Sequence, residues 1–255
     1  MLCAFDFDGT LAPIAPQPDQ VHIRHGVLQR LNTLRRHAPV AVITGRSVED
    51  ARARMRFEPD YLVGNHGLEG VPGWNGHAAE YEKFCRQWRA ELSERMGRGG
   101  LEPAIWLEDK RYSLSLHYRA AEHRSLAEKQ LADLVATLRP KPRIIGGKCV
   151  LNLVPVDAPD KGQALAQLLR DSQCESAIYV GDDATDEDVF RLRDRSILTV
   201  RIGHAAHTAA AFFLDNRSEV AILLDELIVR LRGVHHQNQA RSRAGDRLDG
   251  AMTSR

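Results

Sequence analysis

The sequence lacks paired cysteines. Its 255 residues include only Cys3, Cys85, Cys149 and Cys174, which lie far apart and form no CxxC motif. A disulfide framework or a cysteine-based zinc site is therefore not indicated, and buried or incidental thiols are expected instead. This use of cysteine is typical of a reducing compartment such as the cytoplasm.

Long apolar runs and a surplus of charge are also missing. No stretch has the length of a membrane-spanning helix, and no basic segment precedes the strand-like residues that begin at Leu2, so no signal peptide is indicated. The net charge of +1 gives no electrostatic reason to bind nucleic acid or an anionic membrane. We therefore expect a cytoplasmic monomer that acts on a small molecule, with neither nucleic acid nor membrane as a partner.

Short apolar runs alternate with helix-like periodicity toward both ends of the chain. Strand-like runs and helix-like segments are found at 2–7, 26–37, 40–43, 48–55, 61–63, 164–169, 177–180 and 197–202. Alternation of this kind is typical of a parallel sheet with helices on both faces. The sequence therefore predicts an α/β fold with a Rossmann-like core.

The middle of the chain has a different pattern. Two long helical segments, 80–96 and 122–138, are each followed by a pair of strand-like runs, at 105–107, 112–118, 143–145 and 148–154, with the second pair turning at Gly146-Gly147. This α+β pattern predicts a second domain at 81–154, inserted into a core formed by 1–80 and 155–233. The polar, aperiodic residues 234–255 are expected to form a disordered tail.

Reactive side chains follow several of the predicted strands. Asp6 and Asp8 come after the first strand, Thr44 after the second, and Asp182-Asp183 after a later one, while Lys161 opens a helix. Ligands of open parallel sheets bind at the carboxyl ends of the strands, so these groups are expected to converge.

The converging groups suit phosphate chemistry. Clustered carboxylates repel one another and need a cation, and oxygen ligands of this kind suit Mg²⁺. An aspartate can attack phosphorus, and a second carboxylate can transfer the proton of the leaving alcohol. Thr44 and Lys161 can donate to the phosphate oxygens, and Gly9 lets the backbone approach them.

The motif Asp6-Phe7-Asp8-Gly9-Thr10-Leu11 resembles the first motif of the haloacid dehalogenase superfamily of phosphohydrolases. Thr44, Lys161 and Gly181-Asp182-Asp183 resemble its second, third and fourth motifs in order. The resemblance implies that Asp6 is the nucleophile, Asp8 the general acid and base, and residues 81–154 a C2-type cap. It also implies that Mg²⁺ is held by Asp6, the backbone of Asp8, and Asp182, assisted by Asp183 and Asp186.

Further segments resemble the trehalose-6-phosphate phosphatases: 6–14, Thr44-Gly45-Arg46-Ser47, Gly64-Asn65-His66-Gly67, His117-Tyr118-Arg119, Gly147-Lys148-Cys149-Val150 and 181–187. This resemblance implies Mg²⁺-dependent hydrolysis of trehalose 6-phosphate to trehalose and phosphate. It implies that Glu108, Lys110, Arg119 and Lys148 contact the disaccharide. The remaining substrate contacts are expected at Gly9, Thr10, Arg46, His66 and Asn152.

Asn152 departs from the family pattern, which usually has Glu at this position. Lys148, Val150 and Asn152 are expected to share one face of a strand, so the amide can still reach the sugar. A carboxylate only accepts hydrogen bonds, whereas an amide also donates. A related phosphatase for another glycosyl phosphate therefore stays open as an alternative.

A catalytically silent sugar-phosphate-binding module is a further alternative. The complete set of Asp6, Asp8, Thr44, Lys161 and Asp182 argues against it, because a silent protein does not need both a nucleophile and an acid–base group. Trp74, Trp88 and Trp106 are expected to be packing residues rather than sugar-binding surfaces.

Overall fold

The computed structural model describes residues 1–15, 21–73 and 77–233. Six parallel strands form the larger sheet, in the order β10-β9-β8-β1-β2-β3. Their bounds are Leu2–Phe5 (β1), Val40–Ile43 (β2), Tyr61–Val63 (β3), Ala177–Gly181 (β8), Ile197–Ile202 (β9) and Phe212–Leu214 (β10). The central strands β1, β2 and β8 are buried along their whole length, as expected for a sheet covered on both faces.

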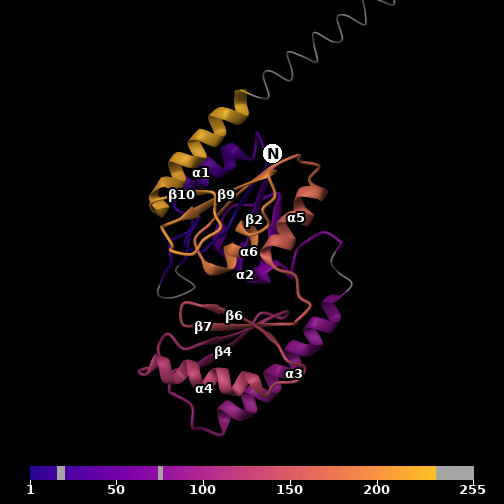
Figure 1. The fold of residues 1–255 in the computed structure, drawn as a ribbon, viewed down its shortest axis with the longest axis vertical. Coiled ribbons are helices and arrows are strands. Elements are labelled where there is room, and N and C mark those ends of the chain that lie inside the picture. The colour runs from indigo at the N-terminus through magenta and orange to yellow at the C-terminus, as the bar shows by residue number, and fades with distance from the viewer. Residues whose placement is uncertain (16–20, 74–76, 234–255) are drawn as a thin grey trace, which may run out of the picture.

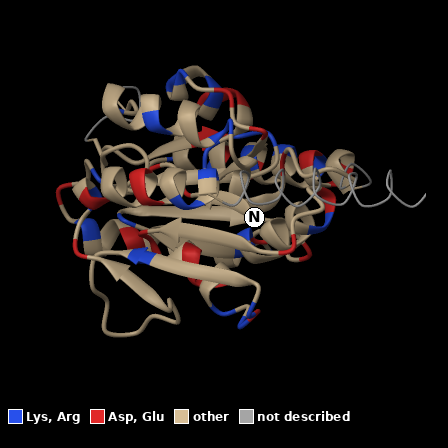
Figure 2. Ribbon diagram, turned by 90° about the horizontal axis from the view of Figure 1, so that it is seen from above, with Lys and Arg blue, Asp and Glu red and all other residues tan. Residues whose placement is uncertain are grey.

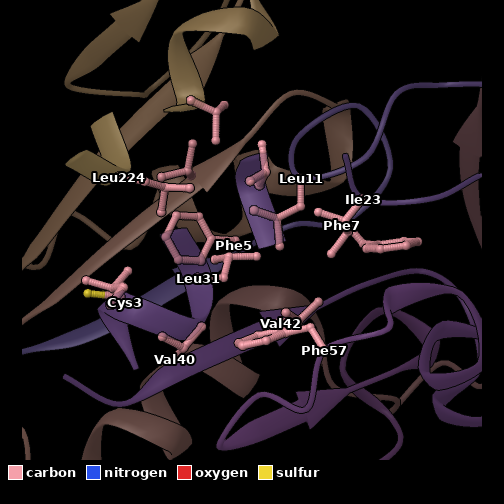
Figure 3. Packing of buried hydrophobic residues seen from close by; sticks show 14 of the residues in the cluster. Cys3, Phe5, Phe7, Leu11, Ile23, Leu31, Val40, Val42, Phe57 and Leu224 are labelled. Carbon is pink, nitrogen blue, oxygen red and sulfur yellow. The ribbon is translucent and has the colours of Figure 1, made fainter. Parts of the chain in front are cut away.

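Helices cover both faces of this sheet (Figure 1). On one face lie α1 (His25–Leu34) and the described part of a final helix, residues 220–233. Figure 3 shows how Phe5 of the sheet packs near Leu31 and Leu224 of these two helices. The other face carries α5 (Lys161–Asp171), while α2 (Val48–Met55) and the short α6 (Glu187–Phe190) follow β2 and β8.

The middle of the chain forms a separate antiparallel sheet, in the order β4-β5-β7-β6. Its strands are Trp106–Asp109 (β4), Leu114–His117 (β5), Arg143–Gly147 (β6) and Val150–Val154 (β7). The helices α3 (Ala78–Gly97) and α4 (Arg124–Ala136) cover one face, where Trp88, Leu116 and Leu131 share a hydrophobic cluster. The opposite face turns toward the parallel sheet (Figure 1).

The two sheets confirm the predicted fold class, although several details differ. The short edge strand β10 and the helix at 220–233 were not predicted, and the predicted tail at 234–255 lies outside the described residues. No helix in the described ranges combines the length and the apolar character needed to cross a bilayer. Figure 2 shows acidic and basic residues interspersed over the ribbon, which agrees with the balanced charge of the sequence.

The turn between β6 and β7 lies two residues later in the sequence than predicted. Gly146 and Gly147 pair with Leu151 and Val150, so the turn consists of Lys148 and Cys149, with Cys149 at a φ of 63°. The prediction that Lys148 lies on a strand with Val150 and Asn152 was therefore wrong. A two-residue turn with positive φ fits the twist of a hairpin, and here a cysteine adopts that conformation without glycine.

Candidate active site

A cavity of about 410 Å³ lies between the carboxyl ends of the parallel strands and the open face of the antiparallel sheet. Most of the predicted site residues line it: Asp6, Asp8, Thr44, Arg46, His66, Glu108, Lys110, Arg119, Lys148, Asn152, Lys161, Asp182 and Asp183. Segments far apart in the sequence therefore meet as predicted, with groups from both sheets facing one space.

A buried acidic cluster forms the floor of the cavity. One carboxylate oxygen from each of Asp6, Asp182 and Asp186 lies within 4.8 Å of the others. The Lys161 Nζ atom, on the first residue of α5, donates to Asp6 Oδ1 at 2.7 Å and to Asp186 Oδ1 at 2.8 Å. The Tyr179 hydroxyl, from β8, donates to Asp186 Oδ1 at 2.7 Å. The start of α5 thus fixes Asp6 and Asp186, and strand β8 adds a second donor to Asp186.

The charges of this cluster are not balanced. Burial raises the pKa of Asp6, and the neighbouring Asp186 and Asp182 add to the rise, while Lys161 opposes it. Burial and the nearby Asp186 raise the pKa of Asp182 to about 6. Burial alone would lower the pKa of Lys161, but Asp186 and Asp6 hold it above its usual value, so the ammonium stays charged.

Three carboxylates and one ammonium in a buried site leave an excess of negative charge. Oxygen ligands of this kind suit a hard divalent cation, and the chain's residues therefore fit a metal site. Asp186, which the family resemblance implies as an assisting residue, completes this cluster, whereas the side chains of Asp8 and Asp183 are not part of it.

The Asp8 carboxylate is held by an arginine. Arg46 Nε and one terminal nitrogen donate to its two oxygens at 2.6 and 2.8 Å, in a fork geometry that fixes the carboxylate plane. Asp50, one turn along α2, accepts from Arg46 at 2.6 Å and also bonds Arg54. This chain of alternating charges sets the direction of Asp8 beside Asp6.

Gly9 and Thr10 were predicted as substrate contacts, but they lie against Asp182 and not on the cavity wall. A Cβ atom at Gly9 would come within 2.2 Å of Asp182 Oδ2, and its φ of 89° also favours glycine. The Thr10 hydroxyl donates to Asp182 Oδ1 at 3.3 Å. Both residues therefore contact Asp182 from outside the cavity and help to position its carboxylate.

His66 lies in the core wall, beside the turn that carries Thr44. Its ring packs against Gly45, where a Cβ would meet the ring at 2.4 Å. Burial holds the pKa of His66 well below 6.5, helped by the charges of Lys110 and Lys161, so the ring is neutral. Its Nδ1 atom is buried without a hydrogen-bond partner among the described residues.

Lys110 connects the antiparallel sheet to the core. Its Nζ atom donates to the Gly45 carbonyl at 3.2 Å, and its own carbonyl accepts from the Asn65 side chain at 3.1 Å. Asn65 also accepts from Ser113 at 2.6 Å. Through these contacts the turn after β4 is held against Gly45 and Asn65 of the core.

Trp106 was predicted to be a packing residue, and that prediction was wrong. It is 46% exposed and lines the cavity. Trp88, by contrast, is fully buried beneath the antiparallel sheet, as predicted; Trp74 lies outside the described residues.

The remaining predicted sugar contacts differ in how firmly they are held. Asn152 is 6% exposed; its Oδ1 accepts from Ser115 at 2.6 Å and its amide donates to the Ile145 carbonyl at 3.2 Å. Arg119 is exposed and donates to the Lys148 carbonyl at 3.1 Å.

Sequence reasoning gave no role to three residues that support the site. Tyr179 bonds Asp186 of the acidic cluster, and Asp50 bonds Arg46 on the cavity wall. Arg201 on β9 donates to the carbonyls of Asp182 and Asp183 at 2.8 and 3.2 Å. The spacing of Arg54 four residues after Asp50 was a usable signal, because both lie on α2, where such pairs face each other. Nothing local to Tyr179 or Arg201 indicated their partners.

Comparison with known proteins gives concordant matches. A family described as trehalose-phosphatase matches residues 4–218. The trehalose-phosphate phosphatase of Mycobacterium tuberculosis is 33% identical over 242 residues, which cover 89% of this chain and 61% of that protein. Trehalose-phosphate phosphatase B of Arabidopsis thaliana is 32% identical over 244 residues, covering 88% and 65%. The chain thus spans less than two thirds of the length of these relatives.

The fold has solved counterparts as well. The crystal structure of a trehalose-6-phosphate phosphatase related protein superposes with a TM-score of 0.73 at 23% identity, covering 92% of this chain and 100% of that one. This match confirms the predicted arrangement of a parallel core with an added antiparallel sheet.

Proposed function

Since the chain belongs to the trehalose-phosphatase family, we propose that it hydrolyses trehalose 6-phosphate to trehalose and inorganic phosphate with Mg²⁺ as cofactor. The observation that carries the proposal is the buried contact of Asp6 with Lys161, in the same cavity as Asp8 and Thr44. A nucleophile, an acid–base group and phosphate donors thus face one space. As expected from the sequence, we propose that the protein acts as a cytoplasmic monomer.

In the first step, a carboxylate oxygen of Asp6 attacks phosphorus and the bond from phosphorus to the sugar oxygen breaks. Asp8, which must carry a proton when the substrate binds, gives that proton to the departing oxygen, which leaves as the sugar hydroxyl. In the second step, Asp8 takes a proton from water, and the water oxygen attacks the phosphorus of the aspartyl-phosphate. The phosphorus–Asp6 bond breaks, and phosphate is released with Asp6 regenerated.

Other residues orient these groups. Lys161 fixes Asp6 at 2.7 Å and offers its charge to the phosphate oxygens. The Thr44 oxygen accepts from the Arg46 backbone amide at 3.2 Å, so its hydroxyl proton is free to point at a phosphate oxygen. Arg46 holds Asp8 and sets the line of proton transfer.

We assign the metal to Asp6 and Asp182, with Asp186 steadied by Lys161 and Tyr179. The backbone of Asp8 and the side chain of Asp183 are further ligands that the sequence predicts. When bound, the cation offsets the negative charge of the carboxylates and of the incoming phosphate.

We also propose that residues 81–154 act as a cap on a core formed by 1–80 and 155–233. The antiparallel sheet and its two helices have their own hydrophobic cluster, and their open face supplies Glu108, Lys110 and Asn152 to the cavity. A cap of this kind excludes bulk water and adds contacts to the sugar.

Phosphate release from a panel of sugar phosphates tests the proposal. We expect trehalose 6-phosphate to be the best substrate, with activity that EDTA removes and added Mg²⁺ restores. Calcium should support less turnover, because its coordination shell is larger and looser. Full activity after exhaustive chelation would contradict the metal assignment, and failure to hydrolyse trehalose 6-phosphate would contradict the substrate.

Asn152 favours a second candidate, a related phosphatase for another glycosyl phosphate. Its amide is already engaged by Ser115 and the Ile145 carbonyl, so it cannot simply replace the acceptor that a carboxylate offers. The same panel decides between the candidates, because a different glycosyl phosphate would then give the higher kcat/KM.

A further inference from the structure

Trp106 presents an exposed indole to the active-site cavity. Its ring stacks on His117 with centroids 4.0 Å apart and planes within 10°. His117 lies directly across from it in the β4–β5 ladder, and the His117 Nε2 atom lies 2.8 Å from Glu108 Oε2. One face of the indole is therefore covered and its orientation fixed, while 46% of the residue remains exposed on the cavity wall.

Trp106, Glu108 and Lys110 lie at alternate positions along β4 and the turn that follows it, and all three line the cavity. Alternate residues of a strand face the same side. Their side chains become less exposed toward the core, at 33% for Glu108 and 12% for Lys110. Lys110 touches Gly45, so this end of the row is the end nearest the phosphate chemistry.

The row formed by Trp106, Glu108 and Lys110 is long enough to contact two linked sugar rings. Four residues of extended chain span about 13 Å. Lys110 at one end is next to the phosphate-binding turn, so Trp106 at the other end lies beyond the reach of a single phosphorylated ring. A phosphate followed by two linked rings fits this span.

We infer that Trp106 is a stacking surface for the second, unphosphorylated ring of a disaccharide phosphate, and that it determines specificity for a disaccharide over a monosaccharide. The inference rests on the proposed function of this site.

The chemistry of the wall suits such a ring. A pyranose presents carbon–hydrogen groups on its faces and hydroxyls around its rim. The exposed indole face can bury the former, and the adjacent Glu108 carboxylate can accept from the latter. Burial would raise the pKa of Glu108, but the hydrogen bond with His117 and the charge of Lys110 lower it, so the carboxylate remains an acceptor.

The exposure of Trp106 has a competing explanation, in which the indole packs against the core when the antiparallel sheet closes over the cavity. The core side of the cavity carries the apolar residues Ile14, Ala15 and Val21, and Ile14 is 48% exposed. If Trp106 served only to pack against them, its loss would weaken hydrolysis of every substrate equally, because closure precedes chemistry for all of them.

The experiment measures kcat/KM for trehalose 6-phosphate and glucose 6-phosphate in wild type, Trp106→Ala, Trp106→Phe and Ile144→Ala. Ile144 is a matched control, since it is 45% exposed on the same sheet but does not line the cavity. We expect Trp106→Ala to lower the ratio of trehalose 6-phosphate to glucose 6-phosphate activity about tenfold, which is what loss of one aromatic contact allows. Trp106→Phe should recover most of the ratio, and Ile144→Ala should leave it unchanged.

Equal losses on both substrates would overturn the inference in favour of a closure contact, and unchanged kcat/KM on both would overturn it in favour of no role. The outcome is separate from the proposed function, which wild type tests alone. If wild type fails on trehalose 6-phosphate but hydrolyses another disaccharide phosphate, the proposed substrate is wrong. The ratio for that substrate over glucose 6-phosphate then decides whether Trp106 binds the second ring.

Discussion

The two walls of the cavity are built differently. On the core wall, Asp6, Lys161 and Asp186 are at least 96% buried and bond one another, and Asp8 is clamped by Arg46. On the wall formed by the antiparallel sheet, Trp106 and Arg119 are exposed, and Arg119 makes its described bond to a backbone carbonyl. Buried, mutually bonded charges are rigid, whereas exposed side chains can adapt to a ligand. We therefore expect the core to determine whether phosphate is transferred and the other wall to determine from which sugar.

The comparison is tested most severely by Asp6→Asn. The amide keeps the shape of the side chain but loses the nucleophilic charge, so turnover should fall by about a thousandfold or more on every phosphate ester. Circular dichroism should show the fold retained. Activity above about a tenth of wild type would rule out an aspartyl-phosphate on this residue.

Arg46→Ala should have the next largest effect. Without the two hydrogen bonds from Arg46, the Asp8 carboxylate is no longer held in one orientation. We therefore expect kcat to fall by about 10- to 100-fold on all substrates alike. Arg54→Ala is the matched control, because Arg54 bonds Asp50 but does not touch Asp8. Steady-state kinetics of both variants is the measurement. A comparable loss of kcat in the two variants would mean that Arg46 acts only through its charge and does not position Asp8.

Arg119→Ala tests the opposite wall. We expect kcat/KM for trehalose 6-phosphate to fall by about tenfold, because a charged donor to the sugar is lost, with a much smaller change for p-nitrophenyl phosphate. Arg98→Ala, at the exposed residue that caps the C-terminus of α3 and does not line the cavity, should change neither rate. Equal losses on both substrates would mean that this wall supports the fold or the chemistry and not the choice of sugar.

The smallest expected effect concerns His66. The unfolded chain binds a proton on this ring as pH falls through about 6.5, whereas the buried ring in the folded protein does not. Stability is therefore lost as pH falls below 6.5, by about 1 kcal/mol for the first pH unit. His66→Asn, which tolerates the residue's φ of 60°, should lose less stability than wild type between pH 7.5 and 5.5 in thermal melts. Equal pH dependence in the two proteins would show that His66 is accessible to protons when folded.

Much of the core was predictable because its signals are local. The strands β2, β3 and β9 and the helix α2 have the predicted bounds, since each is a short apolar run or a periodic segment beside turn or cap residues. The edge strand β10 was missed because it has three residues and two exposed phenylalanines, which give no alternation to recognise. The β6–β7 turn was predicted at Gly146-Gly147 because glycine is a strong turn signal. In the structure both glycines pair with residues of β7, and the turn follows them.

The sequence by itself determined which groups could carry the chemistry. Asp6, Asp8, Thr44 and Lys161 each follow a strand or open a helix, and parallel strands bring their carboxyl ends to one edge of the sheet. Only the tertiary structure decided how these groups are partnered. Pairing of Asp8 with Arg46, and of Asp186 with Lys161 and Tyr179, joins residues on different elements at distances set by sheet register and helix docking. The same reason applies to Trp106, whose exposure depends on a strand face that remains open because the helices cover the opposite side.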